Sequence, residues 1–255
     1  MRDSSLEGSG MRKMGGTIQG RVGITLGAIL LLFCEMAVAG SITGTVVFEG
    51  KAPKMRALAI EADPYCVAMY QGKEPPTYEF LVLGEGQTMA NVLIRVVDGL
   101  PERTYPVPTE AAVLTQKGCI YSPHVLVVRP GQKLRILNPD GINHNVHAKP
   151  KVNTEFNRSM SKKRLEIVHT FTEAEEVFKI NCDVHAWMSA YCLVTEHPFY
   201  AVTGSDGAFT IDNLDPGEYE IEAWQERLGT QRVRVTVSAD EPSRVDFTFK
   251  RPTAK

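Results

Sequence analysis

The stretch Cys182-Asp-Val-His185-Ala-Trp-Met188 places three metal-binding side chains within seven residues. It lies between two short apolar runs, Glu176–Ile180 and Ala190–Val194, that are typical of strands in a β-sandwich. A thiolate, an imidazole and a thioether together favour copper, because soft sulfur ligands select Cu(I) and imidazole also accepts Cu(II). The stretch therefore predicts a metal-binding segment on a β scaffold.

A second nitrogen ligand would complete two histidines, a cysteine and a weak axial methionine, the set typical of electron-transfer copper sites. The segment Asn143-His144-Asn-Val-His147 supplies one about forty residues upstream, a spacing typical of ligands on neighbouring strands. Spacing alone leaves His144 and His147 as competing ligands. Two further alternatives concern sulfur: Met188 could fill a gap in the core, and Cys182 could form a disulfide with Cys192.

Most of the chain consists of short runs rich in β-branched residues, separated by Gly, Pro, Asn and Asp. Examples are residues 42–48, 91–97, 125–128 and 133–137. Such runs at close spacing predict an all-β chain with a sandwich or barrel, rather than alternating strands and helices. Only residues 154–165 have some helical character, and their basic, polar composition favours a solvated loop.

Two segments resemble the cupredoxins, the blue copper family that includes plastocyanin and amicyanin. The first reads Tyr121-x-Pro-x-Val-x-Val-x-x-x-Gly131-x-x-Leu-x-x-x-Asn138, followed by His144-Asn-Val-His. The second runs from Phe171-Thr to Val177-Phe-Lys-Ile-Asn-Cys182-x-x-His185-x-x-Met188, with the ligand spacing of the amicyanins. The resemblance covers roughly residues 115–196 and implies a Greek-key β-sandwich with one copper site.

The cupredoxin resemblance also assigns roles to individual residues. It implies His144, Cys182 and His185 as equatorial copper ligands and Met188 as the axial ligand. Asn145 would form a hydrogen bond to the Cys182 loop and hold the two ligand segments in register. An apolar collar around the edge of His185 would consist of Ile142, Ala186 and Trp187. His147 would face the neighbouring surface, while His124 and His169 are expected to be structural.

The C-terminal residues 197–255 have a different sequence pattern, in which Asp-Gly and Pro-Gly turns separate short predicted strands. The pattern G-S-D-G-x-F-x-I at 204–211 and L-x-P-G-x-Y-x-I-x-A at 214–223 resembles the carboxypeptidase regulatory-like (transthyretin-like) β-sandwich. This implies a second, small sandwich that acts as scaffold. Residues 40–114 are expected to be an N-terminal β extension of a copper domain that spans residues 40–196, with some strands completing that sandwich and others packing against the C-terminal domain.

The N-terminal residues 1–39 combine basic residues, an apolar run from Val22 to Cys34 and a final Ala37-Val-Ala39. This pattern predicts a secretory signal peptide and a periplasmic or otherwise extracytoplasmic protein, with an uncleaved membrane anchor as the alternative. The mature chain is then expected to have no membrane span. In an oxidising compartment Cys66 and Cys119 are expected to form a disulfide, although unpaired thiols stay open.

The net charge of −2 gives no electrostatic reason to expect nucleic acid as a partner. With six histidines and no H-x-H pair, the sequence favours a single copper ion and argues against a multicopper oxidase or nitrite reductase. We therefore expect an electron carrier that serves redox proteins and is not an enzyme. Copper delivery and a metal-free binding or structural module remain as alternatives, and zinc also suits thiolate and imidazole.

Overall fold

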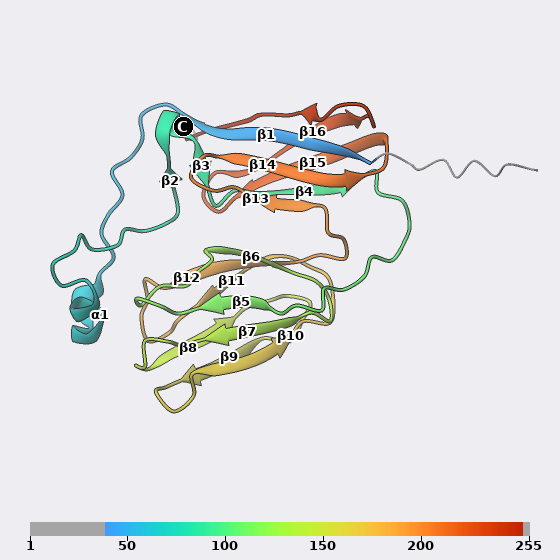
Figure 1. Ribbon diagram of the computed structural model, residues 1–255. Coiled ribbons are helices and arrows are strands. Elements are labelled where there is room, and N and C mark those ends of the chain that lie inside the picture. Colours follow the sequence, from blue (N-terminus) through green and yellow to red (C-terminus); the bar gives the residue numbers. More distant parts are fainter. Residues whose placement is uncertain (1–38, 252–255) are drawn as a thin grey trace, which may run out of the picture. The chain divides into compact units, whose positions relative to one another are not determined.

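The computed structural model describes residues 39–251 and is almost entirely β (Figure 1). Within this part, the α-helix α1 (Pro64–Met69) is accompanied by two 3₁₀ helices, η1 (Ile60–Ala62) and η2 (Glu85–Gln87). The prediction of an all-β chain is confirmed. No helix among residues 39–251 has the length and apolar character to cross a membrane. The expected signal peptide lies, except for Ala39, outside the described residues.

The first sandwich contains the residues that resemble a cupredoxin. One sheet has the order β10 (Glu166–Thr170), β7 (Lys133–Leu137), β5 (Ala112–Thr115). The other has the order β6 (Val125–Val128), β12 (Ser189–Val194), β11 (Glu175–Asn181), β8 (His144–Ala148), β9 (Phe156–Met160). Alternating side chains of these strands, such as Leu134, Val146 and Ile180, are fully buried in one shared core. Each contributes about 1.5–3 kcal/mol through burial.

The second sandwich has its own core and consists of three groups of strands. One sheet joins β14 (Ala208–Leu214), β1 (Gly40–Glu49) and β17 (Ser243–Arg244), and β18 (Phe247–Lys250) also pairs with β1. Another joins β13 (Tyr200–Val202), β4 (Leu93–Asp98), β15 (Gly217–Gln225) and β16 (Gly229–Val237). The short strands β2 (Val82–Leu83) and β3 (Met89–Ala90) pair with each other.

The expected division of the chain at residue 196 is wrong for the N-terminal extension. Strand β1 pairs with β14 and β18, and β4 pairs with β13 and β15, so both belong to the second sandwich. The physical reason is the alternation of β1: Ile42, Val46 and Phe48 are buried with the aromatic core of that sandwich. The second sandwich is therefore built from two parts of the described chain. One part precedes the strands of the first sandwich in the sequence, and the other follows them.

Residues 154–165 also differ from the solvated loop that their composition favoured. They contain β9, which pairs with β8 in register from His144–Met160 to Ala148–Phe156. Three of its five side chains are exposed, as expected for an edge strand, so its polar composition concealed it.

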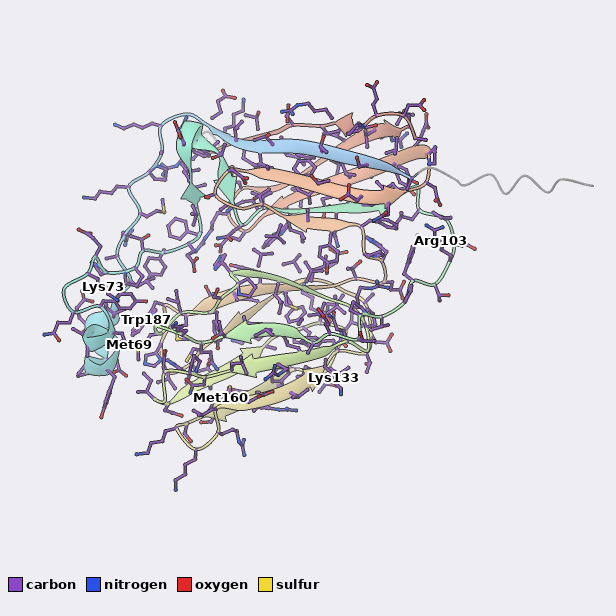
Figure 2. All side chains as sticks on the ribbon, viewed as in Figure 1. Met69, Lys73, Arg103, Lys133, Met160 and Trp187 are labelled. Carbon is purple, nitrogen blue, oxygen red and sulfur yellow. A yellow bond between two sulfur atoms is a disulfide. The ribbon has the colours of Figure 1, made fainter. Side chains whose placement is uncertain are left out.

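The segment between β1 and β2 packs against the first sandwich, although both of these strands belong to the second sandwich. Leu58, Ile60 and Cys66 are buried in the core of the first sandwich. Met69, at the end of α1, packs against the same core, which includes Trp187 (Figure 2). We call residues 60–70 the cover segment.

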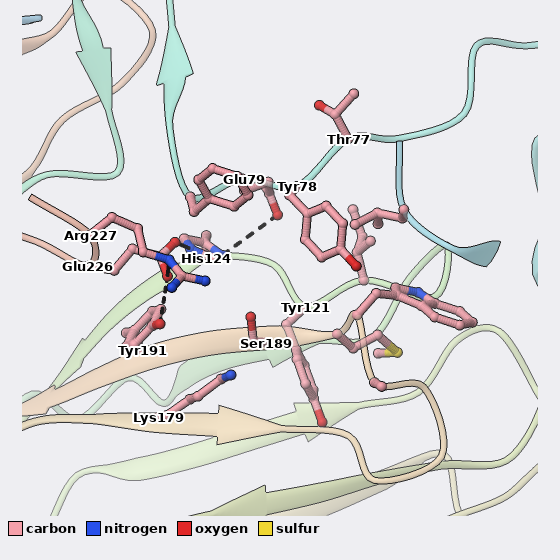
Figure 3. Close-up of a pocket in the computed structure, with 16 residues that line it drawn as sticks. Thr77, Tyr78, Glu79, Tyr121, His124, Lys179, Ser189, Tyr191, Glu226 and Arg227 are labelled. Carbon is pink, nitrogen blue, oxygen red and sulfur yellow. Dashed lines mark hydrogen bonds and ion pairs between the residues drawn. The ribbon is translucent and has the colours of Figure 1, made fainter. Parts of the chain in front are cut away.

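Contacts join the two sandwiches through both apolar and charged side chains. Leu93 of β4 forms a small buried cluster with Val125 and Leu193 of the first sandwich. Nearby, His124 Nε2 lies 2.8 Å from Glu226 Oε1, and the Tyr191 hydroxyl donates to Glu226 Oε2 at 2.6 Å. These residues line a cavity of about 160 Å³ that also touches Trp187 and Met188 (Figure 3).

Candidate metal centre

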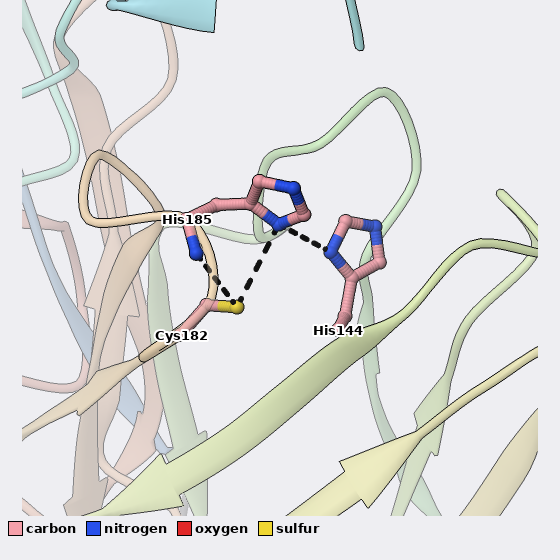
Figure 4. Close-up of side chains that lie close together, drawn as sticks. All are labelled: His144, Cys182 and His185. Carbon is pink, nitrogen blue, oxygen red and sulfur yellow. Dashed lines mark hydrogen bonds between the residues drawn. The ribbon is translucent and has the colours of Figure 1, made fainter. Parts of the chain in front are cut away.

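Two adjacent strands bring the candidate metal ligands together. His144 is the first residue of β8, and Cys182 directly follows β11, which pairs with β8. The loop after Cys182 folds back on itself, because Met188 N–H donates to His185 C=O at 2.9 Å and Cys182 N–H to Met188 C=O at 3.2 Å. His144, Cys182 and His185 therefore meet at one end of the sandwich (Figure 4).

The distances between the three side chains suit a single metal ion. His144 Nδ1 lies 2.9 Å from His185 Nδ1, and Cys182 Sγ lies 3.8 Å from His185 Nδ1. One nitrogen or sulfur atom from each residue lies within 4.8 Å of the others. Metal–nitrogen bonds of about 2.0 Å and metal–sulfur bonds of about 2.3 Å fit such separations. All three residues are at most 2% exposed.

The outer nitrogens of both imidazoles bind carboxylates. His144 Nε2 lies 3.1 Å from Asp140 Oδ2, and His185 Nε2 lies 3.0 Å from Asp63 Oδ2. A carboxylate can only accept a hydrogen bond, so this network assigns the proton of each neutral ring to Nε2. Both Nδ1 lone pairs then converge beside the Cys182 sulfur, which is favourable when a cation binds them and unfavourable otherwise. The residues present therefore fit a metal ion.

Hydrogen bonds and neighbouring charges shift the pKa values of the groups in this cluster. Burial raises the pKa of the Cys182 thiol, but hydrogen bonds with His144 and His185 outweigh burial and lower this pKa to about 6. Burial lowers the pKa of both imidazoles, but their anionic neighbours raise the pKa overall. The hydrogen bond from His185 lowers the pKa of Asp63. At neutral pH the centre thus offers a thiolate, the form of cysteine that binds metals.

Asn145 links the two ligand-bearing segments. Its side-chain oxygen accepts hydrogen bonds from the backbone N–H groups of Asp183 at 2.6 Å and Val184 at 3.3 Å. The same oxygen lies 3.3 Å from Cys182 Sγ. The bond to the Cys182 loop that the sequence led us to expect is therefore present, and it fixes the loop relative to β8.

The cover segment lies over His185. Cys66 and Cys119 form the expected disulfide, with their Cα atoms 5.9 Å apart, and Cys66 Sγ lies 3.7 Å from His185 Nε2. Two further hydrogen bonds hold the Cys119 region: Trp187 Nε1–H donates to Cys119 C=O at 3.0 Å and the Tyr70 hydroxyl to Gly118 C=O at 2.8 Å. The outer edge of His185 therefore faces Asp63 and the disulfide. Of the expected collar of Ile142, Ala186 and Trp187, the Trp187 ring packs against His185, with ring centroids 5.0 Å apart.

The other residues that the sequence offered as ligands or structural residues lie in different surroundings. Met188 is 1% exposed and lines the cavity of Figure 3, and its backbone closes the ligand loop as described above. His147 is held by Asp183 and Glu155 through both ring nitrogens, so it is not part of the cluster. His169 packs between Phe156 and Phe171. Cys182 and Cys192 are both free thiols, so the alternative disulfide is not formed.

Sequence reasoning missed Asp63 and Asp140. Asp140 lies in the Pro139-Asp-Gly141 turn four residues before His144, and Asp63 precedes Pro64 as the N-cap of α1. These patterns indicate a turn and a helix start. Neither pattern points to a metal ligand.

Comparisons with known proteins match the two sandwiches separately. A family model described as the carboxypeptidase regulatory-like domain matches residues 192–250, which confirms the resemblance noted for the C-terminal residues. No curated protein matches the chain.

Several solved structures resemble part of the chain. A Cu-containing nitrite reductase from Thermus scotoductus matches with 17% identity and a TM-score of 0.32, over 40% of this chain and 26% of the reductase. A purple cupredoxin from Nitrosopumilus maritimus matches with 22% identity and a TM-score of 0.28, over 33% of this chain and 99% of that protein. An amicyanin variant with Cu(I) matches with 24% identity and a TM-score of 0.30, over 40% and 98%.

Proposed function

We propose that this protein binds one copper ion through His144, Cys182 and His185, with Met188 as axial ligand, and carries single electrons between redox proteins outside the cytoplasm. The observation that supports this most is the convergence of the Nδ1 atoms of His144 and His185 and the Sγ atom of Cys182 in one buried cluster. Two histidines and a cysteine with a long axial methionine are the ligands of electron-transfer copper sites.

A copper ion bound by these ligands would supply a one-electron couple, Cu(II)/Cu(I). The protein residues would hold the ligands in nearly one arrangement for both oxidation states. Asn145 fixes the Cys182 loop to β8, and the cover segment with its disulfide holds Asp63 on His185. One electron would enter from a reduced donor protein and leave to an oxidised acceptor, with no bond formed or broken.

The burial of the proposed ligands favours electron transfer over copper delivery. Copper delivery requires the ligands to exchange with those of a partner, and the three proposed equatorial ligands are at most 2% exposed. An electron needs only a short connection to the surface. The Asp63 side chain supplies one, because it is 26% exposed and hydrogen-bonded to His185. These observations favour an electron carrier, which is not an enzyme.

The visible spectrum of protein loaded with one equivalent of Cu(II) tests this proposal. We expect an intense thiolate-to-copper band, and its loss in the variant Cys182→Ser. Cys192→Ser is the matched control, because Cys192 is the other free cysteine among residues 39–251 and burial raises its pKa, which keeps it protonated. A wild-type protein that stays colourless, or a band that survives in Cys182→Ser, would contradict the proposal.

A further inference from the structure

The two carboxylates on the outer nitrogens of His144 and His185 have no place in the proposed ligand set. Asp140 is nearly buried, with 4% of its side chain exposed, and Asp63 is 26% exposed. We propose that Asp63 and Asp140 are positioning residues that make the centre prefer Cu(II) over Cu(I) and so lower its reduction potential. This inference rests on the proposed function.

The physical reason lies in the charge that each carboxylate places behind a ligand ring. An imidazole whose outer N–H donates to a carboxylate is a more basic ligand. The negative charge also acts through a buried, weakly polarisable region, where charge interactions are stronger than in water. Both effects stabilise the divalent ion more than the monovalent one. The same bonds fix each ring with Nδ1 directed into the cluster.

The surrounding structure holds both carboxylates in place. Asp140 accepts hydrogen bonds from the backbone N–H groups of Gly118 at 2.7 Å and Cys119 at 2.8 Å. Asp63 accepts from Tyr65 N–H at 2.8 Å as the N-cap of α1. The disulfide between Cys66 and Cys119 ties these two segments together next to the rings. The carboxylates are therefore fixed relative to the imidazoles before any ion binds.

The test compares Asp63→Asn and Asp140→Asn with the control Asp183→Asn. Asparagine is as good an N-cap as aspartate, so the first change keeps α1. The Asp183 side chain is adjacent to Cys182 but contacts His147, Asn145, Asn157 and Asn181 rather than a proposed ligand ring. We expect Asp63→Asn and Asp140→Asn each to weaken Cu(II) binding by about 10–100-fold and Cu(I) binding less. Each tenfold fall in the Cu(II) affinity relative to the Cu(I) affinity raises the reduction potential by about 59 mV.

The measurements are the reduction potential by spectroelectrochemistry and, on metal-free protein, the protonated ring nitrogens of His144 and His185 by long-range ¹H–¹⁵N NMR. We expect the potential to rise in both test variants and to change little in Asp183→Asn. In the metal-free wild type we expect protons on Nε2 of both rings, with His185 alone altered in Asp63→Asn. Copper-loaded variants with unchanged potentials, or an equal rise in Asp183→Asn, overturn this inference alone. A wild type that binds no copper overturns the proposed function as well.

Discussion

At the scale of single residues, Asn145 shows how one side chain connects two segments that are distant in the sequence and carry the proposed ligands. Its oxygen serves two backbone N–H groups of the Cys182 loop, and its amide nitrogen donates to Asn157 at 2.6 Å and Asp183 at 3.1 Å. The side chain is 6% exposed, so water cannot readily replace these bonds. A buried backbone N–H that loses its acceptor costs about 1–3 kcal/mol.

We therefore predict that Asn145→Ala lowers the free energy of unfolding of the metal-free protein by about 1–3 kcal/mol. Urea denaturation followed by fluorescence measures this. The matched control is Asn157→Ala, which removes the exposed partner of the amide nitrogen and leaves the bonds to the oxygen intact. The control should change stability by less than about 0.5 kcal/mol. Equal losses in the two variants would contradict the role given to the Asn145 oxygen.

The residues that make the cluster could largely be predicted from the sequence, whereas Asp63 and Asp140, which contact the outer nitrogens of its imidazoles, could not. Spacing and the cupredoxin resemblance pointed to His144, Cys182 and His185, because the residue types and their separation can be read directly from the sequence. Asp63 lies 122 residues from His185, and no local rule links a helix cap to an imidazole that distant. Only the folded arrangement of the cover segment brings these two side chains together.

At the scale of elements, strand β1 is the clearest departure from the expected organisation. Its alternating buried side chains were visible in the sequence, but alternation indicates only that one face is buried, not which core buries it. The partner strands β14 and β18 lie near the other end of the chain. Pairing over such a distance in sequence is decided by the fit of side chains and backbone, which a single sequence does not display.

Gly44 provides a test of the position of β1. A Cβ atom at Gly44 would lie 1.7 Å from the Val245 carbonyl oxygen and 2.7 Å from the Phe209 ring, so Gly44→Ala should destabilise the protein by about 1–3 kcal/mol. Gly217→Ala is the control in β15 of the same sandwich, where the nearest atom is 3.7 Å away. Thermal unfolding should show a clear loss for Gly44→Ala alone. Similar behaviour of the two variants would contradict the pairing of β1 in the second sandwich.

At the scale of the whole molecule, polar contacts join the two sandwiches. Arg95 of β4 donates to Glu222 of β15 within the second sandwich and to Glu176 of β11 in the first sandwich, whose side chain is 80% exposed. His124 Nε2 lies 2.8 Å from Glu226 Oε1, and these two side chains are only 5% and 6% exposed. Buried charged groups need their partners, because an unpaired charge away from water is costly. These pairs therefore make the contact between the sandwiches specific.

We predict that Glu226→Gln lowers the free energy of unfolding by about 1–3 kcal/mol, because His124 and Tyr191 lose a charged acceptor. Glu166→Gln is the matched control, since Glu166 forms an ion pair with Arg135 whose two side chains are more than 40% exposed. Exposed pairs contribute little, so this variant should change stability by less than about 1 kcal/mol. Calorimetry of the full chain measures both variants, and a larger loss in Glu166→Gln would contradict the prediction.

The most direct test of the copper centre is the copper K-edge X-ray absorption spectrum of the protein loaded with one equivalent of copper. We predict a first coordination shell with one sulfur from Cys182 and two imidazole nitrogens from His144 and His185. The short sulfur contribution should disappear in Cys182→Ser and persist in Cys192→Ser. A shell of nitrogen and oxygen atoms alone in the wild-type protein would contradict the assignment.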